Sequence, residues 1–235
     1  MRRILFLIVS FGVQLSTAAS DTTTNGGDKI GENITVVARV FYDSSYDEKL
    51  KGKTDSEERK SSSSKPPKEY FEKLFQTVQT RFNERNVSIK IDVGNVTKIN
   101  NLSAPYEQSE LSLNGSQTLD NLKNYSTYLG APNNAVYFLY TTKNIYKKID
   151  RGDRMPLDLQ DMATYGTFCT DNVSAAVVKD RPVRWIYWNT VEALANIFGV
   201  KHYSRFRKSD LKTMNETFRR CQASEQTGAL SLSTK

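Results

Sequence analysis

The segment 191–202, VEALANIFGVKH, carries polar side chains whose spacing could place them around one metal ion. Glu192 and Asn196 are four residues apart, so on a helix they lie on one face. Gly199 suits the left-handed conformation that ends many helices, and the turned chain would then bring His202 back toward them. Zinc prefers imidazole, thiolate and carboxylate ligands, and a neutral amide is a poor one. Glu192, Asn196 and His202 therefore predict a degenerate metal site that is weak or empty. The alternative for His202 is an ordinary polar residue after a helix.

Residue types exclude several other catalytic arrangements. His202 is the one histidine of the chain, so a histidine-dependent triad has no other candidate. The sequence has no glycine-rich phosphate-binding loop and no Cys-x-x-Cys pair. Arg151, Gly152 and Asp153 form an RGD tripeptide, which in an exposed loop could present its guanidinium and carboxylate to an integrin. A chance match of three residues is the alternative interpretation.

The elements that must position these residues alternate between strands and helices. Strands are predicted at 33–42, 87–93, 135–140 and 175–178, and the apolar 135–140 should be buried on both faces. Helices are predicted after Pro67, with an apolar stripe from Phe71 to Phe82, and at 119–129, 185–198 and 209–220. This order predicts an α/β fold with a mostly parallel sheet and helices on its faces.

The sequence predicts one domain over residues 30–222. Residues 51–67, KGKTDSEERKSSSSKPP, have almost no apolar content and predict a flexible surface insertion. A single strand before this insertion could not hold a core, so we expect no domain boundary there. The small, polar residues 223–235 predict a disordered tail.

The N-terminus predicts secretion. Arg2 and Arg3 precede the apolar run 4–13 and the small residues STAAS, which is typical of a signal peptide over residues 1–19. A run of about ten apolar residues is too short for a membrane span, which needs about 20. Eight Asn-x-Ser/Thr triplets predict N-glycosylation; they begin at Asn33, Asn86, Asn95, Asn101, Asn114, Asn124, Asn172 and Asn215. Cys169 and Cys221 suit an oxidising compartment, and one disulfide between them is the simplest outcome.

The charge of the chain is moderately basic. The formal net charge is +7, and removal of Arg2 and Arg3 with a signal peptide would lower it by two to +5. Basic residues concentrate in 143–154 and 201–212, which could attract an acidic glycan or a phosphate-rich partner. The alternative is a pair of solvated surfaces. Nucleic acid is not expected as the partner of a secreted chain.

The segment 191–202 resembles the zinc-binding helix of the metzincin metallopeptidases, H-E-x-x-H-x-x-G-x-x-H. On that pattern Glu192 replaces the first ligand, Ala193 the glutamate that acts as general base, and Asn196 the second ligand, while Gly199 and His202 are kept. The stretches VARVFYDSSY (37–46), YGTFCTDNVSAAVVKD (165–180) and TFRRC (217–221) are similar to reprolysin-like metzincins in the same order. In size, leader, sequons and degenerate helix, the chain also resembles the secreted 28 kDa salivary group of metastriate ticks.

The resemblance implies a metzincin-like domain with a twisted mixed sheet, flanking helices and a short C-terminal subdomain tied back by Cys169–Cys221. Alanine at position 193 cannot take a proton from a metal-bound water, which removes a group worth 10²–10⁴-fold in rate. We therefore expect a secreted, inactive metallopeptidase-like protein that binds an extracellular or host protein, with no cofactor. The alternatives are a weak zinc endopeptidase, which would need zinc, and an RGD-dependent integrin ligand.

Overall fold

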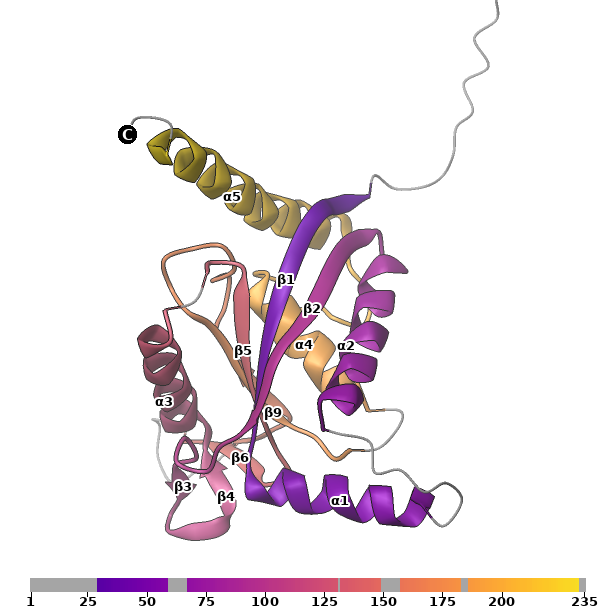
Figure 1. The fold of residues 1–235 in the computed structure, drawn as a ribbon, viewed down its shortest axis with the longest axis vertical. Helices are drawn as coiled ribbons and strands as arrows, with labels where there is room; N and C mark the ends of the chain where they lie inside the picture. The colour runs from indigo at the N-terminus through magenta and orange to yellow at the C-terminus, as the bar shows by residue number, and fades with distance from the viewer. Residues whose placement is uncertain (1–28, 59–66, 131, 149–156, 183–185, 233–235) are drawn as a thin grey trace, which may run out of the picture.

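The computed structural model describes residues 29–58, 67–130, 132–148, 157–182 and 186–232, and the side chains of 52–58 and 222–232 are outside that description. The elements follow the order β1 (Ile30–Tyr42), α1 (Ser44–Glu58), α2 (Pro67–Asn83), β2 (Val87–Lys98), β3 (Pro105–Tyr106), β4 (Ser109–Asn114), α3 (Gly115–Tyr128), β5 (Ala135–Thr141), β6 (Asn144–Lys147), β7 (Leu157–Leu159), β8 (Asp161–Ala163), β9 (Ser174–Lys179), α4 (Trp188–Ile197) and α5 (Lys208–Leu232). The result is the predicted α/β fold (Figure 1).

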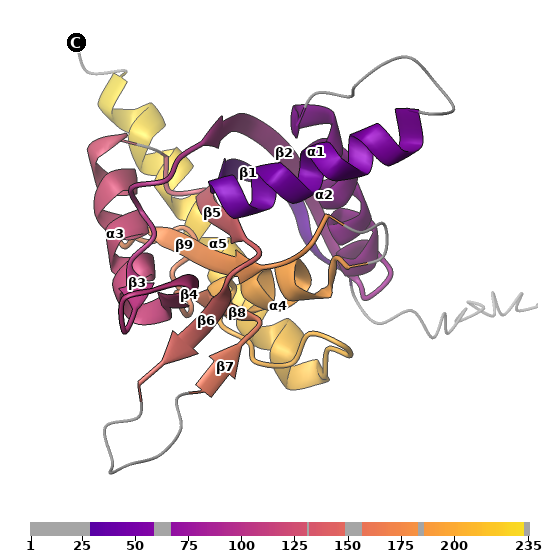
Figure 2. The ribbon, with the colours of Figure 1, turned by 90° about the horizontal axis from the view of Figure 1, so that it is seen from below.

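The main sheet has the strand order β2-β1-β5-β9-β8. Its first four strands are parallel, and β8 pairs antiparallel with β9 at one edge. A second sheet, β3-β4-β6-β7, lies on the same side as α3 (Figure 2). The predicted parallel core is confirmed, whereas the short strands of the second sheet and β8 are additions that the sequence pattern does not indicate.

The alternating side chains of the central strands separate two buried clusters. On one face, Val36, Ala38 and Val40 of β1 pack with α2, α4 and the first half of α5. On the other face, Phe41 of β1 packs with Leu122 of α3 and with the second sheet. The strand β5 contributes to both clusters, which confirms its predicted burial on both faces.

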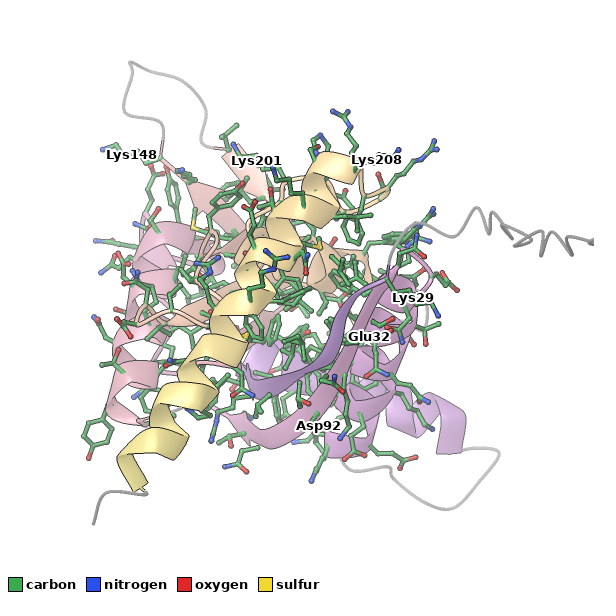
Figure 3. All side chains as sticks on the ribbon, turned by 90° about the horizontal axis from the view of Figure 1, so that it is seen from above. Lys29, Glu32, Asp92, Lys148, Lys201 and Lys208 are labelled. Carbon is green, nitrogen blue, oxygen red and sulfur yellow. A yellow bond between two sulfur atoms is a disulfide. The ribbon has the colours of Figure 1, made fainter. Side chains whose placement is uncertain are left out.

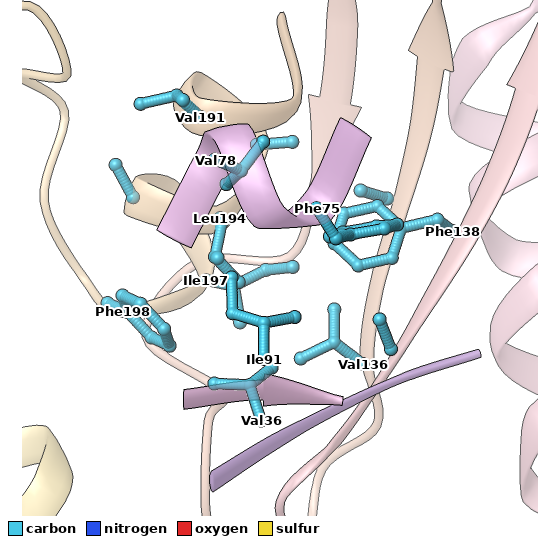
Figure 4. Packing of buried hydrophobic residues seen from close by; sticks show 14 of the residues in the cluster. Val36, Phe75, Val78, Ile91, Val136, Phe138, Val191, Leu194, Ile197 and Phe198 are labelled. Carbon is cyan, nitrogen blue, oxygen red and sulfur yellow. The ribbon is translucent and has the colours of Figure 1, made fainter. Parts of the chain in front are cut away.

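The predicted apolar stripe of α2 is confirmed, because Phe71, Leu74, Phe75, Val78 and Phe82 are all buried. Figure 4 shows Phe75 and Val78 of α2 close to α4, with Phe75 beside Phe138 of β5; the two rings lie 5.0 Å apart in an edge arrangement. Burying a phenylalanine removes it from water at a gain of about 2–3 kcal/mol. The helices α2 and α4 are therefore held against the same face of the sheet.

The structure extends helices into two segments for which the sequence predicts none. The predicted insertion at 51–67 contains the second half of α1, up to Glu58, and the first residue of α2; residues 59–66 lie outside the described part. The start of α1 is anchored by buried Tyr46 and Leu50, and the Asp43 carboxylate accepts a hydrogen bond from the Tyr46 amide at 3.0 Å. Once a helix is capped and anchored, charged residues continue it at little cost.

The predicted tail at 223–235 is likewise helical as far as Leu232, as the end of α5. Met214 and Phe218 of α5 belong to the same buried cluster as α2 and α4, so the first half of α5 packs onto the main core. The disulfide between Cys169 and Cys221 is present, as expected, and joins the loop before β9 to α5. Closure of a loop of 52 residues stabilises a fold by about 4 kcal/mol in the chain-entropy estimate.

Candidate functional site

The helix α4 is apolar on the side that faces the sheet and polar on the opposite side. Thr190, Val191, Ala193, Leu194, Ala195 and Ile197 are buried. Glu192 and Asn196 are half-buried on the remaining face, as their spacing of four residues predicts. The helix ends as predicted: Gly199 has a φ of +89°, and its amide donates to the Asn196 carbonyl at 2.9 Å.

Asp161 is the residue that the sequence interpretation missed. It opens the edge strand β8, which packs against α4, and its carboxylate lies beside Glu192 and accepts a hydrogen bond from the Asn196 side chain. The Glu192 carboxylate is also a hydrogen-bond partner of the Tyr203 hydroxyl. These four residues form a polar cluster between α4, β8 and the loop after Gly199, which we call the α4 cluster.

The electrostatics of the α4 cluster are those of two carboxylates held together. Burial, followed by the nearby Glu192 charge, raises the pKa of Asp161 from 3.8 to about 7, although the Asn196 hydrogen bond acts in the opposite direction. Burial also raises the pKa of Glu192, and the Tyr203 hydrogen bond offsets part of that rise. Two like charges at close range are costly, so near neutral pH the pair tends to keep one proton.

His202 contacts a different carboxylate, that of Asp210. Its Nδ1 lies 3.4 Å from the Asp210 carboxylate at the start of α5, and its side chain is 47% exposed. Tyr203, the next residue, is the one whose side chain reaches Glu192. The structure therefore brings Glu192 and Asn196 together, adds Asp161 and Tyr203, and places His202 on a different partner.

The donor set does not fit a catalytic zinc site. Such a site needs three good ligands and a base beside the metal-bound water. The α4 cluster offers two carboxylates and a poor amide ligand, while the imidazole is engaged with Asp210. Ala193, at the position where the resemblance requires the base, is fully buried. Among the described residues, no group of three or more histidine, cysteine, aspartate or glutamate side chains is arranged to hold a metal.

A polar crevice of about 550 Å³ lies at the carboxyl ends of β1 and β5. Ligands of open α/β sheets often bind at this edge, where the strand order reverses. It is lined by Asp43, Ser44, Ser45, Glu48, Asn100, Ser103, Glu110, Leu111, Thr142 and Lys143. None of the residues predicted from segment 191–202 takes part, so the crevice and the α4 cluster are separate features.

Only some of the remaining predicted sites lie in the described part of the chain. Arg151, Gly152 and Asp153 lie outside the described residues, as does the predicted signal peptide at 1–19. Five of the eight sequon asparagines are exposed: Asn33, Asn95, Asn101, Asn124 and Asn172. Asn86, Asn114 and Asn215 are partly buried. Within the described ranges, no helix has the length and apolar character that a membrane span needs.

No protein-family model and no curated protein sequence matches the chain. Among solved structures, the chain is similar to archaemetzincin from Methanopyrus kandleri, at 11% sequence identity and a TM-score of 0.38. The match covers 82% of this chain and 96% of that one. A likeness at this level says nothing about activity, and the mixed α/β architecture rests on the strands and helices described above.

Proposed function

We propose that the chain is a secreted, glycosylated protein with a metzincin-like domain that has no peptidase activity and acts by binding another extracellular protein. The observation that carries this proposal is the environment of Ala193. At the position where a metzincin has its general base, the chain has a methyl group that is 0% exposed and packed into the main core. A group with no titratable atom cannot accept the proton of an attacking water.

Three features support the metzincin-like part of the proposal. Gly199 turns the chain in the left-handed conformation that the motif requires, with a φ of +89°. Cys169 and Cys221 form the disulfide that the resemblance implies. The main sheet is mixed, as the resemblance implies, because β8 pairs antiparallel with β9 at the edge of otherwise parallel strands.

The disulfide and the sequons support the secreted part, because disulfides persist in oxidising compartments. Asn114 illustrates how a partly buried sequon can still accept a sugar. Its Oδ1 caps α3 by accepting a hydrogen bond from the Gln117 amide at 3.2 Å. A glycan is attached through the side-chain nitrogen, so the cap and the modification use different atoms.

A protein that only binds its partner leaves it at full length, whereas a peptidase leaves fragments. The glycosylated protein, secreted from eukaryotic cells and immobilised, should retain a plasma or platelet protein saturably and at full length. Electrophoresis of the eluted partner and of the flow-through is the measurement. Partner fragments that disappear when a chelator is added would contradict the proposal and favour the weak zinc endopeptidase.

A further inference from the structure

The segment Lys201–Lys212, which we call the basic loop, joins α4 to the first turn of α5. Its cationic side chains are all exposed: Lys201, Arg205, Arg207, Lys208 and Lys212. Its one acidic residue, Asp210, is 8% exposed. The exposed charges of the basic loop are therefore all positive, whereas an ordinary solvated surface mixes both signs.

The shape of the basic loop is held by contacts with α2 and α4. The Phe206 ring stacks on Phe82 with centroids 5.4 Å apart, and the Arg81 side chain donates to the Ser204 carbonyl at 2.7 Å. Tyr203 packs near the Trp188 ring, with centroids 6.4 Å apart. Because these rings turn toward the domain, the arginines on both sides of Phe206 project into solvent. The cations are thus displayed on an anchored backbone.

The Asp210 carboxylate makes its contacts within the basic loop. One carboxylate oxygen accepts a hydrogen bond from the Arg207 amide at 2.8 Å, and the other lies 3.4 Å from the His202 ring. This contact ties down the start of α5, where the helix dipole already favours anions. The carboxylate is therefore turned to the backbone and does not neutralise the exposed cations of the loop.

We propose that the basic loop binds a sulfated polysaccharide of the extracellular space. A linear polyanion needs a row of accessible cations and no deep pocket. Lys201 and Lys208 project toward the same edge of the molecule, near the start of α5 (Figure 3). None of the large, exposed hydrophobic residues in the described part of the chain lies in this segment, so the surface does not suit insertion into a lipid bilayer. The choice of an extracellular polyanion rests on the proposed secretion.

The test is the affinity of the secreted, glycosylated protein for heparin at physiological ionic strength. Arg205→Gln, Arg207→Gln and Lys208→Gln together should weaken binding about tenfold, since three exposed ion pairs are worth about one decade in Kd. The matched control is Lys49→Gln, Lys51→Gln and Lys68→Gln, which removes the same charge from exposed sites. The controls lie on α1 and at the start of α2, at the opposite end from the start of α5 (Figure 1). The control should change the Kd less than twofold.

Several outcomes would overturn the proposal. The wild-type protein could fail to bind heparin, both variants could weaken heparin binding equally, or the protein could bind unsulfated hyaluronan as tightly as heparin. Tighter binding to anionic vesicles or to DNA at the same salt would also overturn it. Circular dichroism spectra check that the variants are folded, and Lys201→Gln with Lys212→Gln is a second loop variant. Failure to bind heparin would leave the absence of peptidase activity untouched, so the two proposals fail separately.

Discussion

Asp161→Asn tests the geometry of the α4 cluster most sharply. The wild-type carboxyl group has a folded-state pKa of about 7 against 3.8 in an unfolded chain. The folded state therefore holds a proton that the unfolded state has lost, between about pH 4 and pH 7. Because the folded pKa is the higher one, the stability from this group is complete below pH 3.8 and is lost as the pH rises through 7.

The size of the effect follows from the shift. A rise from 3.8 to about 7 is about three pKa units, or about 4 kcal/mol at 1.4 kcal/mol per unit. Water at the partly exposed edge of the cluster screens the charge, which reduces the expected effect to about 2–4 kcal/mol. Asparagine removes the ionisation and can still accept the hydrogen bond from Asn196, while its own amide can donate to Glu192.

We therefore expect Asp161→Asn to raise the free energy of unfolding by about 2–4 kcal/mol at pH 8 and by less than about 1 kcal/mol at pH 4. Urea unfolding at both pH values, followed by circular dichroism with a chelator present, measures this difference. Asp171→Asn, at an exposed site, is the control and should change stability little at either pH. Equal destabilisation by Asp161→Asn at both pH values would refute the placement of this carboxylate beside Glu192.

Three further predictions concern the core around α4. Ala193→Glu should lower the free energy of unfolding by about 3 kcal/mol or more without giving peptidase activity, because the side chain is 0% exposed; a stable, active variant would contradict the proposal. Gly199→Ala should cost more than about 1 kcal/mol in thermal unfolding because φ is +89°, whereas Gly94→Ala, where φ is not positive, should cost less. Cys169→Ala with Cys221→Ala should lower stability by about 4 kcal/mol in urea, and an unchanged midpoint would show that the disulfide is dispensable.

Elements with a strong apolar period were predictable from the sequence. The stripe from Phe71 to Phe82 predicts α2, and the continuous apolar run of β5 predicts a strand buried on both faces. In both cases the residues of the element themselves carry the burial pattern. The left-handed Gly199 was predictable for the same local reason, because glycine tolerates a positive φ.

Elements stabilised by distant partners were not predictable. The strand β8 has only three residues, Asp-Met-Ala, and exists because β9 offers backbone hydrogen bonds along its edge. Beyond Leu50, α1 has no apolar stripe, so the helix depends on its cap and on its first two turns. A period-based interpretation misses both.

The candidate site shows the same division. The shared face of Glu192 and Asn196 follows from their spacing, but their partner Asp161 lies 31 residues before Glu192 on a strand with no pattern of its own. The orientation of His202 depends on Asp210, which no motif connects to it. Sequence spacing therefore located the helix face and could not assign the side chains that complete it.

The central claim, that the domain binds without cleaving, is tested most directly on the secreted, glycosylated protein. Its zinc content is measured together with cleavage of a broad peptide library, with and without a chelator. We predict zinc well below one ion per chain and no chelator-sensitive cleavage. Stoichiometric zinc with cleavage that the chelator abolishes would contradict the account.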